Sequence, residues 1–128
     1  MRRILFVLVL VLVALPAWAT NWEKIGDSAD NTATFYIDRS SAQYNGSHVT
    51  FWDKTDLSTP QQLSGIKPYT AILRKSDMDC AERTVRLLAL NFYDSTGTVV
   101  FSDDAPHGAV TAIVPDSSAD AEREALCR

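Results

Sequence analysis

The N-terminal segment constrains how the rest of the chain folds, because it predicts export into an oxidising compartment. Residues 1–3 form a positively charged start, and residues 4–15 are an unbroken apolar run. Residues 17–19, Ala-Trp-Ala, then match the small-x-small pattern of a signal peptidase site. We therefore expect a cleavable signal peptide that is cut between Ala19 and Thr20.

The same segment predicts that no membrane anchor remains after cleavage. The apolar run has 12 residues, whereas a helix needs roughly 20 to cross a bilayer core. Thr20 cannot accept the lipid that a cysteine at this position would carry. Arg2-Arg3 is compatible with twin-arginine export, but the strongly hydrophobic run favours the general secretory route. We expect residues 1–19 to be removed and residues 20–128 to form the exported domain.

Two cysteines, Cys80 and Cys127, both lie in the predicted exported domain. In an exported protein this even, minimal count favours one intramolecular disulfide. Such a bond would close a loop of 48 residues, counting both ends. In the chain-entropy model the bond stabilises the domain by about 4 kcal/mol. Two free thiols, a metal pair and an intermolecular bridge are the alternatives, although no Cys-x-x-Cys or His-rich context supports metal binding.

The charge balance of the exported domain limits its partners. Without Arg2 and Arg3, 10 Lys and Arg face 16 Asp and Glu, so the net charge is about −6 with neutral histidines. This acidic balance repels phosphate backbones and anionic lipid headgroups, and no stripe of Lys and Arg opposes it. We therefore expect neither nucleic acid nor a membrane surface as a partner. The length predicts one domain with a modest core.

Alternating apolar and polar residues predict strands in the first half of the domain. Residues 32–38 place Phe35 and Ile37 on one face, which is typical of a half-buried strand. Residues 22–26 are suited to an earlier strand.

The dipeptide Asn45-Gly46 predicts a hairpin between residues 42–44 and residues 47–52. Both turn positions of such a hairpin need positive φ, which Asn-Gly adopts readily. Residues 56–67 carry little periodicity and contain Ser-Thr-Pro and Ser-Gly. They predict a surface loop.

The second half predicts an antiparallel meander. Residues 69–78 have an extended pattern, and residues 84–93 are apolar on both faces. A strand of the latter kind is expected in the centre of a sheet, covered on both sides. Residues 94–97 then turn the chain into a strand over 98–102, with Gly97 in a left-handed conformation.

The segment after Pro115 predicts a helix. Residues 116–118 supply N-cap candidates, and Asp120 and Glu122 bring negative charge to the first turn. A narrow apolar stripe would let the helix lie on the sheet, with Cys127 fastening its last turn near Cys80; it consists of Ala121, Ala125 and Leu126. The predicted fold class is α+β: one domain, with an antiparallel β-sheet of about six strands and a C-terminal α-helix.

No catalytic motif is found in the chain. A Gly-x-Ser-x-Gly elbow is absent from the sequence, and the five glycines are scattered singly rather than forming a phosphate cradle. Residues 103–107, Asp-Asp-Ala-Pro-His, could supply metal ligands. Pro106 and Gly108 mark this segment as a loop, however, and His48 is distant in sequence. A solvated acidic turn is therefore expected, with no metal and no cofactor.

A pair of carboxylates, Asp77 and Asp79, precedes Cys80. Such a pair performs acid/base chemistry when its pKa values are pushed apart. At a strand end the pair is expected to satisfy turn hydrogen bonds instead. The prediction is therefore that the protein is not an enzyme; only clustering of this pair with Asp103 and His107 in one concave pocket would indicate one.

Four aromatic residues on or near the predicted strands form a candidate binding surface: Tyr36, Tyr44, Trp52 and Tyr69. Tyr and Trp are enriched in binding hot spots. They are also ordinary strand and core residues, so packing in the core is the alternative.

Several short motifs follow one another along residues 22–127: Phe35-Tyr36-Ile37-Asp38, Val49-Thr50-Phe51-Trp52, Asp79-Cys80, Tyr93-Asp94 followed by Gly97 and Val99-Val100, and Val114-Pro115-Asp116-Ser117 ahead of Cys127. In this order, and with the two cysteines, the chain resembles the surface-adhesin E family of small exported bacterial proteins. The resemblance implies an antiparallel sheet whose C-terminal helix is tied down by a Cys80–Cys127 bridge. It brings no catalytic residues. Residues 109–113 depart from the family pattern, because they lack a Trp that similar sequences carry there.

The resemblance implies adhesion to host extracellular-matrix and serum proteins. The leading hypothesis is therefore a non-enzymatic envelope protein of a Gram-negative bacterium that binds a protein partner. The alternative is a soluble periplasmic accessory or structural domain without adhesive activity. A homodimer is a further expectation, because one short helix cannot cover an apolar strand such as residues 84–93. Export past the inner membrane is expected in either case, to the periplasm or beyond.

Overall fold

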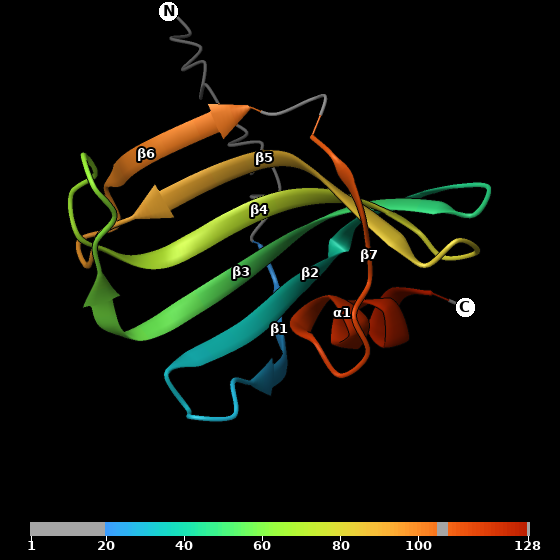
Figure 1. Ribbon diagram of the computed structural model, residues 1–128, viewed down its shortest axis with the longest axis horizontal. Helices are drawn as coiled ribbons and strands as arrows, with labels where there is room; N and C mark the ends of the chain where they lie inside the picture. Colours follow the sequence, from blue (N-terminus) through green and yellow to red (C-terminus); the bar gives the residue numbers. More distant parts are fainter. Residues whose placement is uncertain (1–19, 105–107, 128) are drawn as a thin grey trace, which may run out of the picture.

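The computed structural model describes residues 20–104 and 108–127 (Figure 1). The predicted signal peptide, with Ala19 of the predicted cleavage site, lies outside these residues, and so does His107. The described chain forms seven strands and one helix: β1 (Trp22–Asp27), β2 (Ala33–Asn45), β3 (His48–Gln61), β4 (Tyr69–Asp79), β5 (Thr84–Tyr93), β6 (Val99–Asp104), β7 (Val110–Ala112) and α1 (Ser118–Leu126).

The strands form one antiparallel sheet. Their order in space is β1-β2-β3-β4-β5-β6, so each strand pairs with its neighbour in sequence. The short strand β7 pairs with the beginning of β5, while β6 pairs with its end. This arrangement confirms the predicted α+β fold, with an antiparallel sheet of about six strands and a C-terminal helix.

The predicted hairpin is present, but its turn lies one residue later than expected. Asn45 belongs to β2 and pairs with His48, so Gly46 and Ser47 form the connection. Gly46 has a φ of 61°, whereas Asn45 is not among the residues with positive φ. The prediction that both Asn45 and Gly46 adopt positive φ is therefore wrong. The strand pairing extends one step further and places only glycine in the left-handed region.

The predicted surface loop over residues 56–67 is also wrong in its first part. Strand β3 continues to Gln61, which pairs with Tyr69 of β4 after a register shift that begins at Asp56. The hydrogen bonds of this part of β3 come from a neighbouring strand, so periodicity within the segment does not reveal them.

Strand β5 matches residues 84–93, and Gly97 has the predicted left-handed φ, at 82°. The strand lies inside the sheet, but it is not covered on both sides as predicted. Only Ala89 and Phe92 of β5 are buried. The other side chains of β5 remain partly exposed because α1 packs against β1 and β2, toward the opposite edge of the sheet (Figure 1).

The helix begins as predicted and covers the hydrophobic core. Ser117 is the N-cap and its hydroxyl accepts the Asp120 N–H. Leu126 is fully buried and Glu122 is 3% exposed. Of the two acidic residues predicted for the first turn, the structure places Asp120 there. The core cluster combines one residue of the helix with residues of β2, β3 and β4; it consists of Ile37, Val49, Phe51, Met78 and Leu126.

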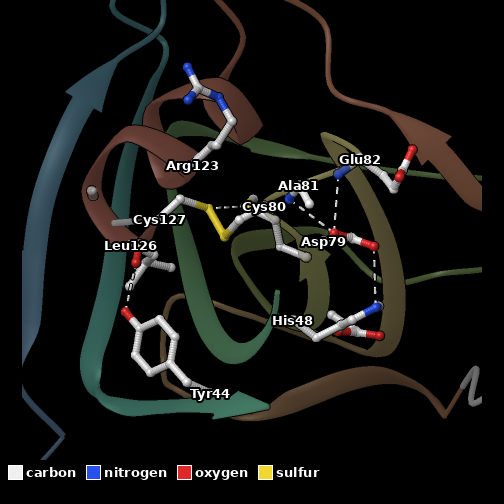
Figure 2. Close-up of a disulfide and its surroundings, with 12 residues drawn as sticks. Tyr44, His48, Asp79, Cys80, Ala81, Glu82, Arg123, Leu126 and Cys127 are labelled. Atoms are coloured by element: carbon white, nitrogen blue, oxygen red, sulfur yellow. Dashed lines mark hydrogen bonds and ion pairs between the residues drawn. A yellow bond between two sulfur atoms is a disulfide. The ribbon is translucent and has the colours of Figure 1, made fainter. Parts of the chain in front are cut away.

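The C-terminal end of α1 is held by a disulfide. Cys80 and Cys127 are bonded, with their Cα atoms 5.7 Å apart (Figure 2). This confirms the intramolecular bond and rules out the free thiols, the metal pair and the intermolecular bridge. Two side chains also donate to carbonyls at the end of the helix: Arg39 Nη1 to Ala125 O and Tyr44 Oη to Leu126 O, both at 2.7 Å. They satisfy acceptors that a helix end leaves without partners.

A buried ionic cluster joins the middle of α1 to the sheet. Arg74 Nε donates to Asp53 Oδ1 at 2.9 Å, and Arg74 Nη2 lies 3.5 Å from Glu122 Oε1. Asp53 is 1% exposed. Burial, together with the nearby Asp53 charge, raises the pKa of Glu122 to about 9. Burial also raises the pKa of Asp53, although its shorter contact with Arg74 opposes this rise, and Glu122 carries the proton at neutral pH.

Removing the disulfide is expected to destabilise the fold strongly. The double variant Cys80→Ser/Cys127→Ser should lose about 4 kcal/mol of unfolding free energy, because the bond restricts the unfolded chain. Urea titration of the exported protein measures this loss, with the exposed loop variant Ser64→Ala as the control. A double variant that unfolds at the wild-type urea concentration would show that the bond contributes no stability.

The Glu122 carboxyl is expected to make stability decrease with pH. Its folded pKa of about 9 lies above the ordinary glutamate value of 4.5, so between these values the folded state holds a proton that the unfolded state releases. The free energy of unfolding therefore falls as the pH rises through this window. Urea midpoints across the window should fall for the wild type and for the exposed control Glu124→Gln. They should fall less steeply for Glu122→Gln, and parallel curves for all three proteins would contradict the assignment.

Candidate functional site

The sheet has a face that α1 does not cover, which we call the open face. Directly paired residues of antiparallel strands point to the same side. Ile37 pairs with Asp53 in the face that α1 covers, so the residues that alternate with them belong to the open face. Two rows of side chains cross the strands there: Trp22, Asp38, Trp52 and Lys75, and beside them Tyr36, Lys54, Leu73 and Asn91.

Lys54 orders two of the aromatic rings of the open face. Its Nζ lies 4.7 Å from the Tyr36 ring centroid and 5.3 Å from that of Trp22. The same atom lies 3.4 Å from Asp56 Oδ2. A cation held against two rings favours one arrangement of all three side chains. The rings are therefore positioned before any partner arrives.

A shallow cavity of about 230 Å³ lies on this face and is called the open-face groove. Its lining residues come from strands β1 to β5 and from the segment before β1: Thr20, Trp22, Asp38, Trp52, Leu73, Asn91 and Tyr93. Asp38 is 8% exposed, and its Oδ1 accepts hydrogen bonds from the Ser40 N–H and hydroxyl. Asn91 Oδ1 accepts the Ser102 hydroxyl at 2.7 Å. The groove thus combines aromatic walls with two oriented polar side chains.

The four aromatic residues selected from the sequence occupy different places. Tyr36 and Trp52 lie on the open face. Tyr44 lies at the helix end, where its hydroxyl meets Leu126 (Figure 2). Tyr69 is 6% exposed and stacks on Phe92, with ring centroids 4.2 Å apart. The structure therefore brings two of the four together and places Tyr69 in the core.

Sequence reasoning missed the other members of the open face. Trp22, Asp38 and Trp52 are neighbours because β1, β2 and β3 pair in one particular register. The amino-acid composition does not indicate that these three residues are neighbours. The strict alternation of side chains along β2 and β3 indicates which residues of one strand share a face. It does not indicate which residues of the two strands are neighbours, because the pairing register cannot be read from either strand alone.

A second polar cluster surrounds His48. Its Nδ1 lies 3.0 Å from Asp77 Oδ1 and its Nε2 lies 3.3 Å from Asp79 Oδ2 (Figure 2). Asp79 also accepts the N–H groups of Ala81 and Glu82, as expected for a turn. The hydrogen bond and the charge of Asp77 raise the pKa of His48 above 6.5. His48 is distant in sequence from residues 103–107, but β3 and β4 pair it directly with Asp79.

Of the set of residues that would indicate an enzyme, the described members Asp77, Asp79 and Asp103 do not line one pocket, and His107 lies outside the described residues. Asp77 and Asp79 share a cavity of about 130 Å³ with His48, and Asp103 is not part of its lining. Asp103 lies on β6, where it pairs with Leu90. Among residues 20–104 and 108–127 no group of three or more His, Cys, Asp or Glu is arranged to hold a metal.

A further cavity lies beside the disulfide. Its volume is about 540 Å³ and it is lined by Tyr44, Gly46, Ser47, Cys80 and Ala81. Figure 2 shows Tyr44 and Ala81 on either side of the bonded cysteines. Since these five lining residues include no carboxylate, imidazole or amine, this cavity offers little for acid/base or ionic chemistry.

The His48 environment predicts a measurable titration. The pKa of His48 should lie above 6.5, and Asp77→Asn should lower it, because the largest favourable contact is then lost. An NMR titration of the imidazole signals measures both values. The only other histidine, His107, is assigned with His107→Gln. An unchanged pKa in Asp77→Asn would show that the contact is not made in solution.

Comparison with known proteins places the chain in a family. The family model described as surface-adhesin protein E matches residues 22–128. Two solved structures of Haemophilus influenzae protein E are similar: the selenomethionine form (14% identity, TM-score 0.59, covering 85% of this chain and 90% of that chain) and crystal form II (15%, 0.60, 87% and 93%).

A structure of protein E from non-typeable Haemophilus influenzae is also similar, with 13% identity and a TM-score of 0.57, over 91% of this chain and 81% of that one. At these identities the likeness establishes a shared fold. No curated protein matches the sequence. Within the part of the chain that the structure describes, no helix is long and apolar enough to cross a membrane. Because the family model spans every described strand and the helix, the chain belongs to the surface-adhesin protein E family.

Proposed function

We propose that the protein is an exported, non-enzymatic envelope protein that binds a protein partner, of the extracellular-matrix class, through the open face. The observation that carries this proposal is the group of aromatic side chains on a sheet face that α1 leaves uncovered; it consists of Trp22, Tyr36, Trp52 and Tyr93. Membership of an adhesin family supports the same conclusion.

The open face has the properties of a binding surface. Trp and Tyr are enriched among the residues that contribute most to binding energy. All four rings are half-buried, so each keeps accessible surface while packing on its neighbours. The contacts of Lys54 with Trp22 and Tyr36 limit the rotamer freedom that binding would remove.

A periplasmic accessory domain without adhesive activity is the second candidate. The predicted first exported residue, Thr20, accepts no lipid, which favours this candidate over display on the cell surface. A homodimer through β5 is compatible with either candidate, because Leu87, Leu88 and Leu90 of this strand are only half-buried. Gel filtration at several protein concentrations tests the dimer.

The adhesive function is tested by direct binding. Protein purified from the cell envelope should bind immobilised vertebrate matrix proteins saturably. Trp52→Ala should weaken this binding by about 2 kcal/mol, roughly thirty-fold in Kd, because it removes a central ring. Val114→Ala is the matched control, since Val114 is 64% exposed and lies on neither row of the open face. Melting temperatures establish that both variants are folded.

The location of the protein separates the two candidates. Protease added to intact cells should cleave an adhesin, whereas a periplasmic domain stays protected until the outer membrane is opened. Absence of saturable binding by the wild type, together with full protection in intact cells, would overturn the adhesive function in favour of the accessory domain.

A further inference from the structure

The open-face groove has a chemical character that a general protein-binding surface does not need. Aromatic rings and one hydrocarbon side chain alternate with a carboxylate and an amide, and the seven lining residues include no cationic side chain. From this combination we infer that the groove binds a neutral oligosaccharide. The inference rests on the open face being the binding surface, and it names the chemical group on the partner that the groove recognises.

The aromatic walls fit the apolar faces of sugar rings. Trp22, Asp38 and Trp52 lie in one row on three adjacent strands. Strands are about 4.8 Å apart, so the two tryptophans flank Asp38 across about 10 Å. A pyranose presents C–H groups on its faces and hydroxyls around its edge. Such a ring stacks on indole while its hydroxyls reach the residue between the two tryptophans.

The polar residues fit the hydroxyl groups. The Ser40 contacts go to Asp38 Oδ1, so Oδ2 keeps its acceptor sites. Asn91 uses Oδ1 to accept the Ser102 hydroxyl, so Nδ2 keeps its donors. A hydroxyl both donates and accepts, which means that each of these groups finds a partner on a sugar. Lys54, which is paired with Asp56, and Lys75 lie on the open face but outside the groove lining. Within the lining the only charged group is the Asp38 carboxylate, which repels negative charge, so sulfated and sialylated sugars fit poorly there.

The shape of the groove also argues for an oligosaccharide over a peptide. The lining runs across the strands from Trp22 on β1 to Asn91 on β5. An extended peptide gains affinity by adding to a free strand edge. Strands β2 to β5 pair on both sides, and only β1, at the edge of the sheet, could accept a further strand, which would lie beside the groove. A chain of sugar rings needs no backbone partners and can lie across the strands.

The test is an array of immobilised oligosaccharides that are neutral, sulfated or sialylated, with extended peptides on the same surface. Protein purified from the cell envelope should bind neutral oligosaccharides only. The strongest neutral probe is then titrated while tryptophan fluorescence is followed. Trp52→Ala and Asp38→Asn should each weaken its binding at least tenfold. Asn91→Ala should weaken binding several-fold. Because Asn91 is only half-buried, this variant tests the groove even if the other two variants fail to fold.

Tyr44→Phe is the matched control, because Tyr44 lies at the helix end away from the groove, and its affinity should equal that of the wild type. Binding to sulfated or sialylated sugars only, to peptides only, or to no probe would overturn the inference. Enzymatic deglycosylation of a bound matrix protein separates this inference from the proposed function. Loss of binding supports the sugar site, whereas unchanged binding overturns it and leaves protein adhesion in place.

Discussion

The Cys80–Cys127 disulfide determines where this protein has its core. Cys127 directly follows Leu126, whose buried side chain meets Phe51, Met78 and the other core residues of the sheet. A helix of nine residues is marginal by itself, so the covalent link to the end of β4 keeps it on the sheet. All fully buried apolar side chains of the described residues belong to this one cluster. Because such a bond forms and persists in an oxidising environment, the predicted export would also be a condition for the fold.

The ionic cluster under α1 fixes the positions of the helix and the strands more than it stabilises the fold. Burying Asp53, Arg74 and Glu122 carries a desolvation cost that their mutual attraction only partly offsets. Asp53 and Arg74 are direct partners in the β3–β4 ladder, so a slip of one residue would turn both away from Glu122. A correct register is thus the one in which the charges meet. The same cluster keeps Glu122 protonated, because a second negative charge beside Asp53 would have no counterion of its own.

Local sequence signals were sufficient to predict much of this fold, but they did not predict how the strands pair. The strand over residues 84–93, the Ser117 cap and the disulfide follow from alternation, capping chemistry and export. The extension of β3 to Gln61 and the short strand β7 depend on partners elsewhere in the chain. Prediction of the candidate site was limited in the same way. Tyr36 and Tyr69 look alike in sequence, yet one lies on the open face and the other stacks in the core.

The two faces of the sheet are consequently under different constraints. The helix-covered face holds the core, the ionic cluster and the disulfide, so most changes there reduce stability. The open face holds rings that keep part of their surface exposed, so side chains that replace them can still reach solvent. Sequence can therefore vary on the open face while the fold persists. Structures with 13% to 15% identity and TM-scores of 0.57 to 0.60 show that the fold persists when most of the sequence differs. Under the proposed function, the open face would determine what such a protein binds, and the helix-covered face keeps that surface in place.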